Sequence, residues 1–593
     1  MKSLSSSRSE GNILMLTLFL IVVISAFVGV AMSVTGTTAR ITDRSRDYAA
    51  ARAAAEGAVE YAYAQWYGIT SSQDAPVSTT NMMAVITPPS FPGFTYAPAS
   101  VDGQLRVDAI DQYGAPTATL SPVSVSLANY PGWSGLSYNY LARAKMMPTL
   151  SDYNFGAGVK RQFQYIVVPL FQSMFFFQDN IEIYKAATMT ISGLVHTNAS
   201  GYMSGQSGNP LTFESNVSYV NTFTSTQDPP YADTWSGWSA NAEVAPVYTT
   251  SQASQLHQVT AMQPLGTSLA SAINTTSGNP NTTSIEEIIQ PPNPNYTDPP
   301  AFAQNRLYNK AGILVQINGS TKTITGQNGV TLTTAQKTAI SNALTAKTAI
   351  YDQREGTNVN VTSVNIGTLD TTLNALTGFN NVLYIYDTTS SSTPNAIRLI
   401  NGGVLPSNGL TVASMNPVYI QGDYNTGTTN NPNAVPANVG NSSDTASPTV
   451  SGYTRVPAAV IGDAVMFLSN SWSDSNSSLS LSARNASNTT YNTAIVSGFM
   501  PSGYQPTVGA QYGYSGGANN FPRFLEDWTN NYCTYYGSMV ELFTSQIFTG
   551  QWNTGNIYAP PIRCWNFDPN YTTTPPPGSL SAVSWSRGTW VKY

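Results

Sequence analysis

The stretch GNILMLTLFLIVVISAFVGVAMSV, residues 11–34, is the segment from which the rest of the chain can be interpreted. It contains no charged residue, and its apolar core at residues 13–34 is about as long as one helix needs to be to cross a bilayer. Lys2 and Arg8 precede it, which favours a cytoplasmic N-terminus. The segment therefore predicts one membrane-spanning helix, with the residues that follow it outside the cytoplasm.

Two other roles for the segment stay open at this stage. One is a cleaved signal peptide, for which Ala31-Met32-Ser33 offers a small-x-small site, although a secretory apolar region usually has only about 7 to 15 residues. The other is an ordinary signal-anchor helix. The residues beyond the span speak against cleavage there, because residues 35–67 contain no proline and AAARAAAEGAVEYAYAQW is rich in strong helix formers. We expect one helix over residues 12–68, roughly 84 Å long at about 1.5 Å per residue, half in lipid and half packed on a globular domain.

The same residues resemble the N-terminal segment of PilX-type minor pilins. A short polar leader and an apolar helix precede RITDRSRDYAAARAAAEGAVEYA, in which residues 54–57 match the AAE-type motif of that family. The resemblance implies a leader at residues 1–11, cleavage between Gly11 and Asn12 by a prepilin peptidase, and assembly with other pilin subunits in a type IV pilus or pseudopilus. Major pilins carry a glutamate five residues after the cleavage point. This chain has Leu16 at that position. PilX-type members commonly lack the glutamate too. The departure therefore argues against a major pilin and not against the PilX-type family.

The composition predicts an extracytoplasmic β-rich body. Only 9% of the 593 residues are charged, while 41% are hydrophobic and 11% aromatic, so the chain has ample side chains to bury and is not typical of disorder. The net charge of −6 is small, and no basic patch indicates nucleic acid. Two cysteines, Cys533 and Cys564, are too few for a disulfide scaffold. They are candidates for one structural disulfide outside the cytoplasm, with two buried free thiols as the alternative.

Beyond the helix, short strand-like runs alternate with Gly, Asn and Ser turns. We expect an α+β protein that is mainly β, whose body is an irregular β-solenoid or a sandwich with no fixed repeat. The regions predicted are a mixed α/β connection, a β-rich region with a Ser/Thr/Asn/Pro-rich loop, a second mixed α/β region and a C-terminal β-rich region, at residues 69–160, 161–300, 301–395 and 396–593.

Several phrases also resemble a family of large β-rich pilus-associated envelope proteins. They occur in the same order and include SGLVHTN, YDQREG, NPVYIQGDYN, AVIGDAVMFLSNSW, GGANNFPRFLEDW and YAPPIRCWNFD. The resemblance implies an envelope-located body on a pilin-like stem. It implies no activity, no cofactor and no catalytic residue.

The motifs that could carry nucleophilic or metal chemistry are weak. Ser515 lies in a G-x-S-x-G pattern, but both histidines, His196 and His257, lie upstream of it, against the order of an α/β-hydrolase. We interpret His196 as a hydrogen-bonded residue at a strand corner. Asp423 and Asp474 lie in oxygen-rich loops that could ligate calcium, but neither has the EF-hand spacing.

Carboxylates are the remaining catalytic candidates, since solenoid enzymes that act on glycans use Asp and Glu alone. The candidates are Asp179 with Glu182, Asp463, and the Glu526-Asp527 pair in NFPRFLEDW. We interpret that last stretch as a short amphipathic helix capping the β body, in which Arg523 and Glu526 share one face.

The sequence thus predicts a structural accessory or minor subunit of tip type, anchored in the inner membrane with a periplasmic body, or extracellular once assembled. Its partners would be other pilin subunits, prepilin peptidase and, if the body is adhesive, a surface or glycan ligand. The alternative hypotheses are a membrane-anchored or secreted carbohydrate-active enzyme and a plain anchored surface module.

Overall fold

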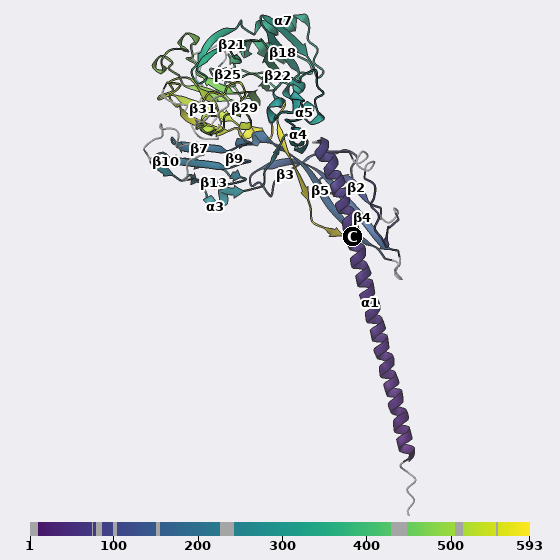
Figure 1. The fold of residues 1–593 in the computed structure, drawn as a ribbon. Helices are drawn as coiled ribbons and strands as arrows, with labels where there is room; N and C mark the ends of the chain where they lie inside the picture. The colour runs from purple at the N-terminus through teal and green to yellow at the C-terminus, as the bar shows by residue number, and fades with distance from the viewer. Residues whose placement is uncertain are drawn as a thin grey trace, which may run out of the picture.

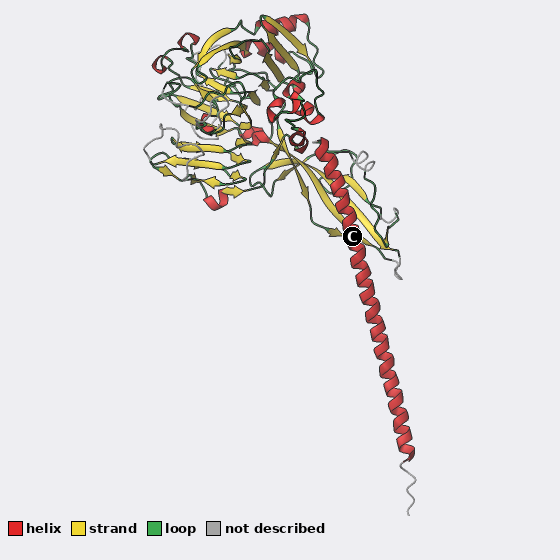
Figure 2. Cartoon of the chain, in the orientation of Figure 1, coloured by secondary structure: helices red, strands yellow, loops and turns green. Residues whose placement is uncertain are grey.

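The computed structural model describes residues 10–73, 75–78, 86–98, 104–149, 155–225, 242–428, 448–503, 514–552 and 556–593. The molecule consists of a very long N-terminal helix, a small antiparallel sheet packed along the C-terminal half of that helix, and a large β-rich body beyond the sheet (Figure 1). The fold is α+β and mainly β, as predicted. Helices in the body are short, and strands dominate it (Figure 2).

Helix α1 spans Glu10–Gln73 without interruption. The sequence predicted this helix but ended it near Gly68, because glycine is a common helix terminator. Gly68 does not end it here, since the following turn still contacts the sheet: Thr70 is fully buried, and its Oγ1 accepts a hydrogen bond from Nε1 of Trp585 at 2.9 Å. Tertiary packing therefore extends the helix beyond the point that local propensity indicates.

The sheet beside α1 is antiparallel, and we call it the stem sheet. Its longest strands, β4 (Ser134–Pro148) and β5 (Ala157–Pro169), pair along most of their length. The chain's last two strands also pair with β5. The other members are β1 (Phe94–Tyr96), β2 (Arg106–Ile110), β3 (Val123–Ser126), β17 (Gln263–Pro264), β34 (Ser581–Arg587) and β35 (Val591–Lys592).

The body is built mostly from parallel strands that stack turn upon turn. An eleven-stranded sheet runs in the order β16-β12-β9-β6-β32-β29-β26-β24-β22-β18-β19, and a six-stranded sheet runs β20-β21-β23-β25-β27-β30. From β22 to β27, successive strands alternate between these two sheets, so each turn of the chain adds one strand to each. Parallel pairing of this kind gives the strand order of a solenoid, not that of an antiparallel sandwich.

The strands of the body, in chain order, are β6 (Ser173–Phe177), β7 (Ile181–Ala186), β8 (Met189–Ile191), β9 (Leu194–Thr197), β10 (Gly201–Gln206), β11 (Leu211–Phe213), β12 (Val217–Tyr219), β13 (Phe223–Thr224), β14 (Glu243–Val244), β15 (Val247–Tyr248), β16 (Leu256–Gln258), β18 (Ile313–Asn318), β19 (Thr321–Gly326), β20 (Thr348–Asp352), β21 (Thr357–Asn365), β22 (Val382–Asp387), β23 (Asn395–Ile400), β24 (Leu410–Ala413), β25 (Val418–Gln421), β26 (Ala458–Gly462), β27 (Val465–Leu468), β28 (Thr489–Asn492), β29 (Ala494–Phe499), β30 (Arg523–Phe524), β31 (Tyr532–Gly537), β32 (Met539–Thr544) and β33 (Ile562–Phe567). The short helices are α3 (Gln252–Gln255), α4 (Thr267–Ala272), α5 (Pro300–Asn305), α6 (Leu307–Lys310), α7 (Thr334–Asn342) and α8 (Ile366–Asn374), with 3₁₀ turns η2 (Leu170–Gln172), η4 (Pro280–Thr282), η5 (Ile285–Ile288), η6 (Asp474–Asn476), η7 (Leu481–Ala483), η8 (Ala518–Asn520) and η9 (Pro569–Thr572).

The long sheet contains two runs of strands that meet in its middle. The first run starts at β6 and moves outward through β9 and β12 to β16. The chain then crosses to the opposite end, enters β18 and returns strand by strand to β32, which pairs in parallel with β6. The body therefore begins and ends at neighbouring positions, and the chain leaves it close to where it entered.

The body is an insertion into the stem sheet. Strand β5 ends at Pro169 and β34 begins at Ser581, and these two residues are paired partners. The residues between them lie outside the stem sheet, except for the short strand β17, which pairs with β34. The C-terminal strands then complete the sheet beside α1, where Figure 1 places the C-terminus.

The stretch NFPRFLEDW does not form the predicted helix. Residues Arg523–Phe524 form strand β30, which pairs in parallel with β27. The predicted ion pair is also wrong: Arg523 pairs with Glu355 at 2.7 Å, while Glu526 accepts hydrogen bonds from Ser469. The three-residue spacing of Arg523 and Glu526 suggested one exposed face of a helix, but both side chains are buried.

Candidate functional site

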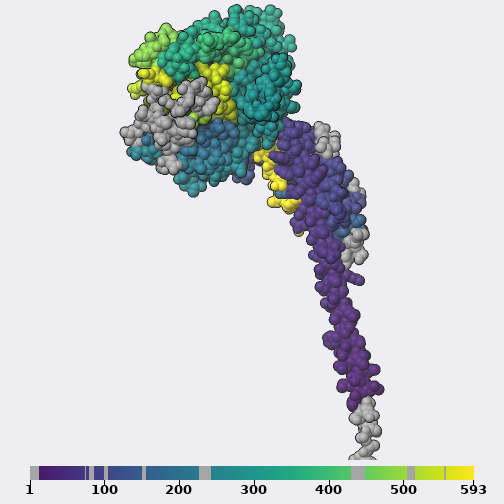
Figure 3. All heavy atoms as spheres, viewed as in Figure 1, coloured from purple at the N-terminus to yellow at the C-terminus, as the bar shows by residue number. Residues whose placement is uncertain are grey.

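The apolar stretch at residues 13–34 of α1 is not packed on the other described residues of the chain. Side chains from Ile13 (62% exposed) to Val34 (60% exposed) point into the surroundings, and the span is long and apolar enough to cross a membrane. Figure 3 shows it standing clear of both the stem sheet and the body. A helix with exposed apolar residues on all sides needs lipid or other helices around it.

The C-terminal half of α1 is docked on the stem sheet through small side chains. Ala54, Ala55, Ala58 and Ala62 are all buried, and their size lets the helix approach the strands closely. Spacings of three and four residues place them on one face of the helix. The same Ala-rich pattern that predicted a helix therefore also defines its docking face.

One large residue, Trp66, closes this interface near the body. It is fully buried, and its ring centroid lies 5.4 Å from those of Tyr140 and Phe163, which project from β4 and β5. Aromatic pairs in such tilted and edge-to-face arrangements add to the free energy gained from area burial. Helix and sheet thus share one hydrophobic core, separate from that of the body.

Polar contacts join the chain's C-terminal residues to the same helix. Glu60 forms ion pairs with Arg161 of β5 and Arg587 of β34. Trp585 of β34 donates from its indole Nε1 to Thr70 Oγ1 at 2.9 Å. Because Glu60 is 40% exposed, its ion pairs are screened by solvent and contribute modestly.

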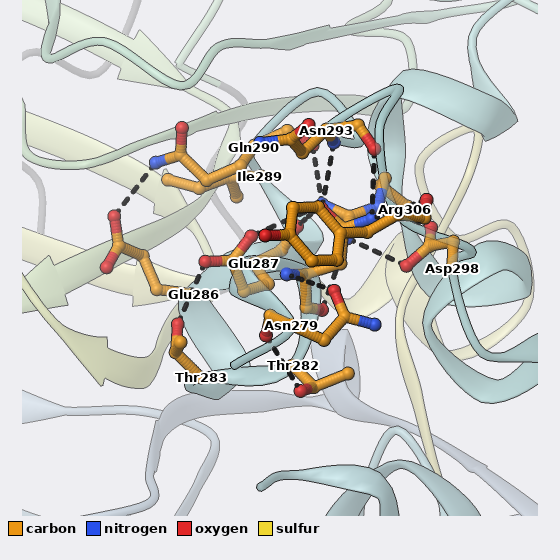
Figure 4. Close-up of polar contacts among 12 residues, drawn as sticks. Asn279, Thr282, Thr283, Glu286, Glu287, Ile289, Gln290, Asn293, Asp298 and Arg306 are labelled. Atoms are coloured by element: carbon orange, nitrogen blue, oxygen red, sulfur yellow. Dashed lines mark hydrogen bonds and ion pairs between the residues drawn. The ribbon is translucent and has the colours of Figure 1, made fainter. Parts of the chain in front are cut away.

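A buried arginine organises the junction between stem and body. The crossing segment between β16 and β18 carries α4 and α5, which both contact α1. Arg306, at the end of α5, is fully buried and forms two hydrogen bonds to Asp298, at 2.7 and 2.9 Å. It also donates to the carbonyls of Glu287 and Gln290 (Figure 4). One guanidinium therefore ties several loops of the crossing segment together, next to the end of the stem helix.

The two residues of the predicted cleavage site lie at the start of this helix. The backbone of Gly11 is helical, and the side chain of Asn12 is exposed. Cleavage between them stays a prediction. Leu16, which replaces the glutamate of major pilins, is 70% exposed within the apolar stretch.

The two cysteines are buried free thiols, the second of the two alternatives. They lie on the neighbouring parallel strands β31 and β33, but Cys533 pairs with Arg563 and Cys564 pairs with Thr534. Successive side chains on a strand point to opposite faces, so this one-residue offset directs the two sulfurs to opposite sides of the sheet. Burial raises the pKa of Cys533 to about 12 and that of Cys564 to about 11, which keeps both thiols protonated.

The candidate carboxylates are buried, each with its own structural partners. Glu182 accepts hydrogen bonds from Ser502 and Ser515, and burial raises its pKa to about 7. Asp463 accepts three hydrogen bonds from the backbone N–H groups of residues 546–548, and burial raises its pKa too. Glu526 accepts from Ser469, and burial raises its pKa to about 7.

The remaining acidic candidates also make local contacts. Asp527 accepts hydrogen bonds from Thr529, and Asp179 donates from its backbone N–H to Glu541. Sequence reasoning missed Glu541. It is fully buried on β32, and burial together with the nearby Asp179 raises its pKa well above the ordinary range. Its position within an apolar strand gave no functional signal.

The two histidines also contact neighbouring protein groups. His196 lies buried in β9, with Nδ1 2.9 Å from Ser218 Oγ and Nε2 2.9 Å from Asn198 Oδ1, and burial lowers its pKa to about 4. His257 contacts the carbonyl of Ser254. Among the residues that the structure describes, no group of three or more metal-ligating side chains is present.

The two aspartates proposed for calcium have partners of their own. Asp474 forms an ion pair with Arg398. Asp423 accepts a hydrogen bond from the backbone N–H of Thr490. In the G-x-S-x-G motif, Gly513 lies outside the described residues.

No protein-family model matches the chain, and no curated protein does. Among solved structures, the chain is similar to the competence-associated pilin ComZ from Thermus thermophilus, with 9% sequence identity and a TM-score of 0.26, over 91% of this chain and 98% of that one. At this TM-score the likeness carries no argument. The geometry of the stem, a long apolar helix docked on an antiparallel sheet, is by itself consistent with a pilin-like segment and with a membrane anchor.

Proposed function

We propose that this protein is an accessory or minor subunit, of PilX-like tip type, in a type IV pilus or pseudopilus. The observation that carries the proposal is the division of one continuous helix, α1, into an exposed apolar half and a half docked on the stem sheet. A plain anchor requires only the first half. A filament subunit requires both, because the apolar half must move from lipid into a bundle of helices while staying rigidly joined to a folded domain.

The partners follow from the chemistry of the exposed half. Its apolar side chains fit the inner membrane before assembly and the corresponding helices of other pilin subunits afterwards. Prepilin peptidase would act between Gly11 and Asn12, on the cytoplasmic side of the span. The stem sheet and the body would then be periplasmic, and extracellular once the filament extends.

The size and position of the body favour a rare position in the filament. The body lies beyond the stem sheet and extends well to one side of the axis of α1 (Figure 3). Copies stacked at every level of a thin helical filament would collide with their neighbours. At the tip the body would be unobstructed, where it could prime assembly or bind a surface or glycan. The proposed role is structural and not enzymatic.

The test is the mature N-terminus, mapped by mass spectrometry in cells with and without prepilin peptidase. We expect the chain to begin at Asn12 only when the peptidase is present. A Gly11→Leu variant should keep its leader. Gly29→Leu is the matched control, because a side chain at Gly29 meets nothing within 4 Å, and it should be processed normally.

Two results would contradict the proposal. A chain that begins near residue 34 would make the span a signal peptide and release the body. Retention of residues 1–11 in both strains would leave a plain membrane anchor. Immunogold labelling of sheared pili adds the position: label at one end per filament supports a tip subunit, and label along the shaft opposes it.

A further inference from the structure

Three side chains in the body place an amine, a carboxamide and a carboxyl group together. Lys347 Nζ lies 3.2 Å from Oδ1 of Asn395 and 2.7 Å from Oδ2 of Asp387. The side chain of Asp387 is fully buried, Asn395 is 9% exposed, and the side chain of Lys347 is 22% exposed. They come from three segments: the residue before β20, the end of β22 and the start of β23.

Surrounding hydrogen bonds hold each group in one orientation. Asn395 donates from Nδ2 to the carbonyl of Thr389 at 2.8 Å, which fixes which end of the carboxamide faces the lysine. Asn360 Nδ2 lies 3.5 Å from the same Oδ1. Asp387 Oδ1 accepts from the hydroxyl and the backbone N–H of Thr389, so Oδ2 is the oxygen left to face Lys347.

We propose that Lys347 and Asn395 become joined by an intramolecular amide bond. Lys347 passes a proton to Oδ2 of Asp387, which lies 2.7 Å from Nζ. The neutral Nζ then attacks Cγ of Asn395. The negative charge that forms on Oδ1 is stabilised by the donor from Asn360.

The step is balanced without any co-reactant. The Nζ–Cγ bond forms and the Cγ–Nδ2 bond breaks, and Asp387 passes two protons in turn from Nζ to the departing nitrogen, which leaves as an ammonium ion. No group is oxidised or reduced. Asp387 ends in its starting state, as a general acid–base.

The bond would lie where the body is most easily opened. Strand β20 is the terminal strand of the six-stranded sheet and is held there by antiparallel pairing with β21. Terminal strands open first because only one edge is paired. A covalent link from the residue before β20 to the start of β23 would close this end of the sheet.

The test is a tryptic digest of the full-length protein, purified in detergent and analysed by tandem mass spectrometry. Trypsin cuts after Lys337, Arg354 and Arg398. We expect a branched species in which residues 338–354, uncut after Lys347, are joined to residues 355–398, lighter than the two peptides together by one ammonia. Intact mass should show the same loss.

Variants locate the bond and test its chemistry. Lys347→Arg and Asn395→Ala should abolish the branched peptide, and Asp387→Asn should abolish it with both joined residues still present. Lys337→Arg, at an exposed position on α7, should leave it unchanged. The wild-type digest decides even if a variant fails to fold. Free peptides 338–347 and 355–398 at their unmodified masses would overturn the proposal and leave an ion pair with an asparagine contact.

Discussion

Replacement of Trp66 by alanine should release the stem helix from its sheet without unfolding the body. A buried tryptophan removes about 150 to 250 Å² from water, which at about 25 cal/mol per Å² stabilises the docked state by about 4 to 6 kcal/mol. Alanine retains part of that area, and Trp→Ala substitutions in cores cost about 3 to 5 kcal/mol. We therefore expect a loss of about 4 kcal/mol.

Hydrogen exchange followed by mass spectrometry measures this loss where it occurs. A change of about 4 kcal/mol corresponds to exchange about 1,000-fold faster, or as fast as in the unfolded chain, for amides of residues 51–70. Peptides from β22 to β26 should keep their protection, because Trp66 belongs to the stem core and not to the body core.

The matched control is Ile41→Ala, on the same helix but 64% exposed. Its effect should stay within about 0.5 kcal/mol. Unchanged protection of residues 51–70 in Trp66→Ala would refute the docking energetics. An equal loss of protection in the body would refute the separation into two cores.

Three further results are expected. Arg306→Met should destabilise the junction by about 3 to 5 kcal/mol, because it leaves Asp298 charged and without its guanidinium partner, and proteolysis within the crossing segment should accelerate accordingly. Burial raises the pKa of Glu182 to about 7 from an ordinary value of 4.5, so between these pH values the folded state binds a proton that the unfolded state does not. Stability therefore falls as pH rises from about 4.5 to 7. The melting temperature should fall less steeply over this range in Glu182→Gln than in the wild type. Glu60→Gln should cost about 1 kcal/mol or less, and 1 M salt should remove most of the difference from wild type in thermal unfolding of the stem.

The sequence predicts well those elements whose cause is local. The stem helix follows from an apolar span and an Ala-rich run without proline. Helix α8 likewise has a local start, because the side chain of Asn365 accepts a hydrogen bond from the backbone N–H of Thr368. These signals lie within one element, so no knowledge of the partner strand is needed.

The elements that sequence reasoning missed depend on contacts between distant residues. The pairing of β34 with β5 joins residues more than four hundred positions apart, and no periodicity in either strand indicates it. Arg306 lies in no recognisable motif, and the sequence analysis did not single it out. In a chain with only 9% charged residues, an arginine was nevertheless a signal for a structural role, and Arg306 is fully buried. The helix predicted for NFPRFLEDW is wrong because the three-residue spacing of its charges also arises by chance in a buried strand and its flanking turns.

The position of the insertion determines how the molecule would carry a mechanical load. A pull on the body reaches the stem sheet through the covalent connections at the paired residues Pro169 and Ser581, and also through the short strand β17. Both connections pull β5 and β34 in the same direction, so their shared hydrogen bonds are not peeled apart. The force passes into the sheet and then to α1 as shear across a long packed face, a geometry in which many contacts must fail together. In the proposed role, a pull on a surface-bound body would load the molecule along this resistant direction.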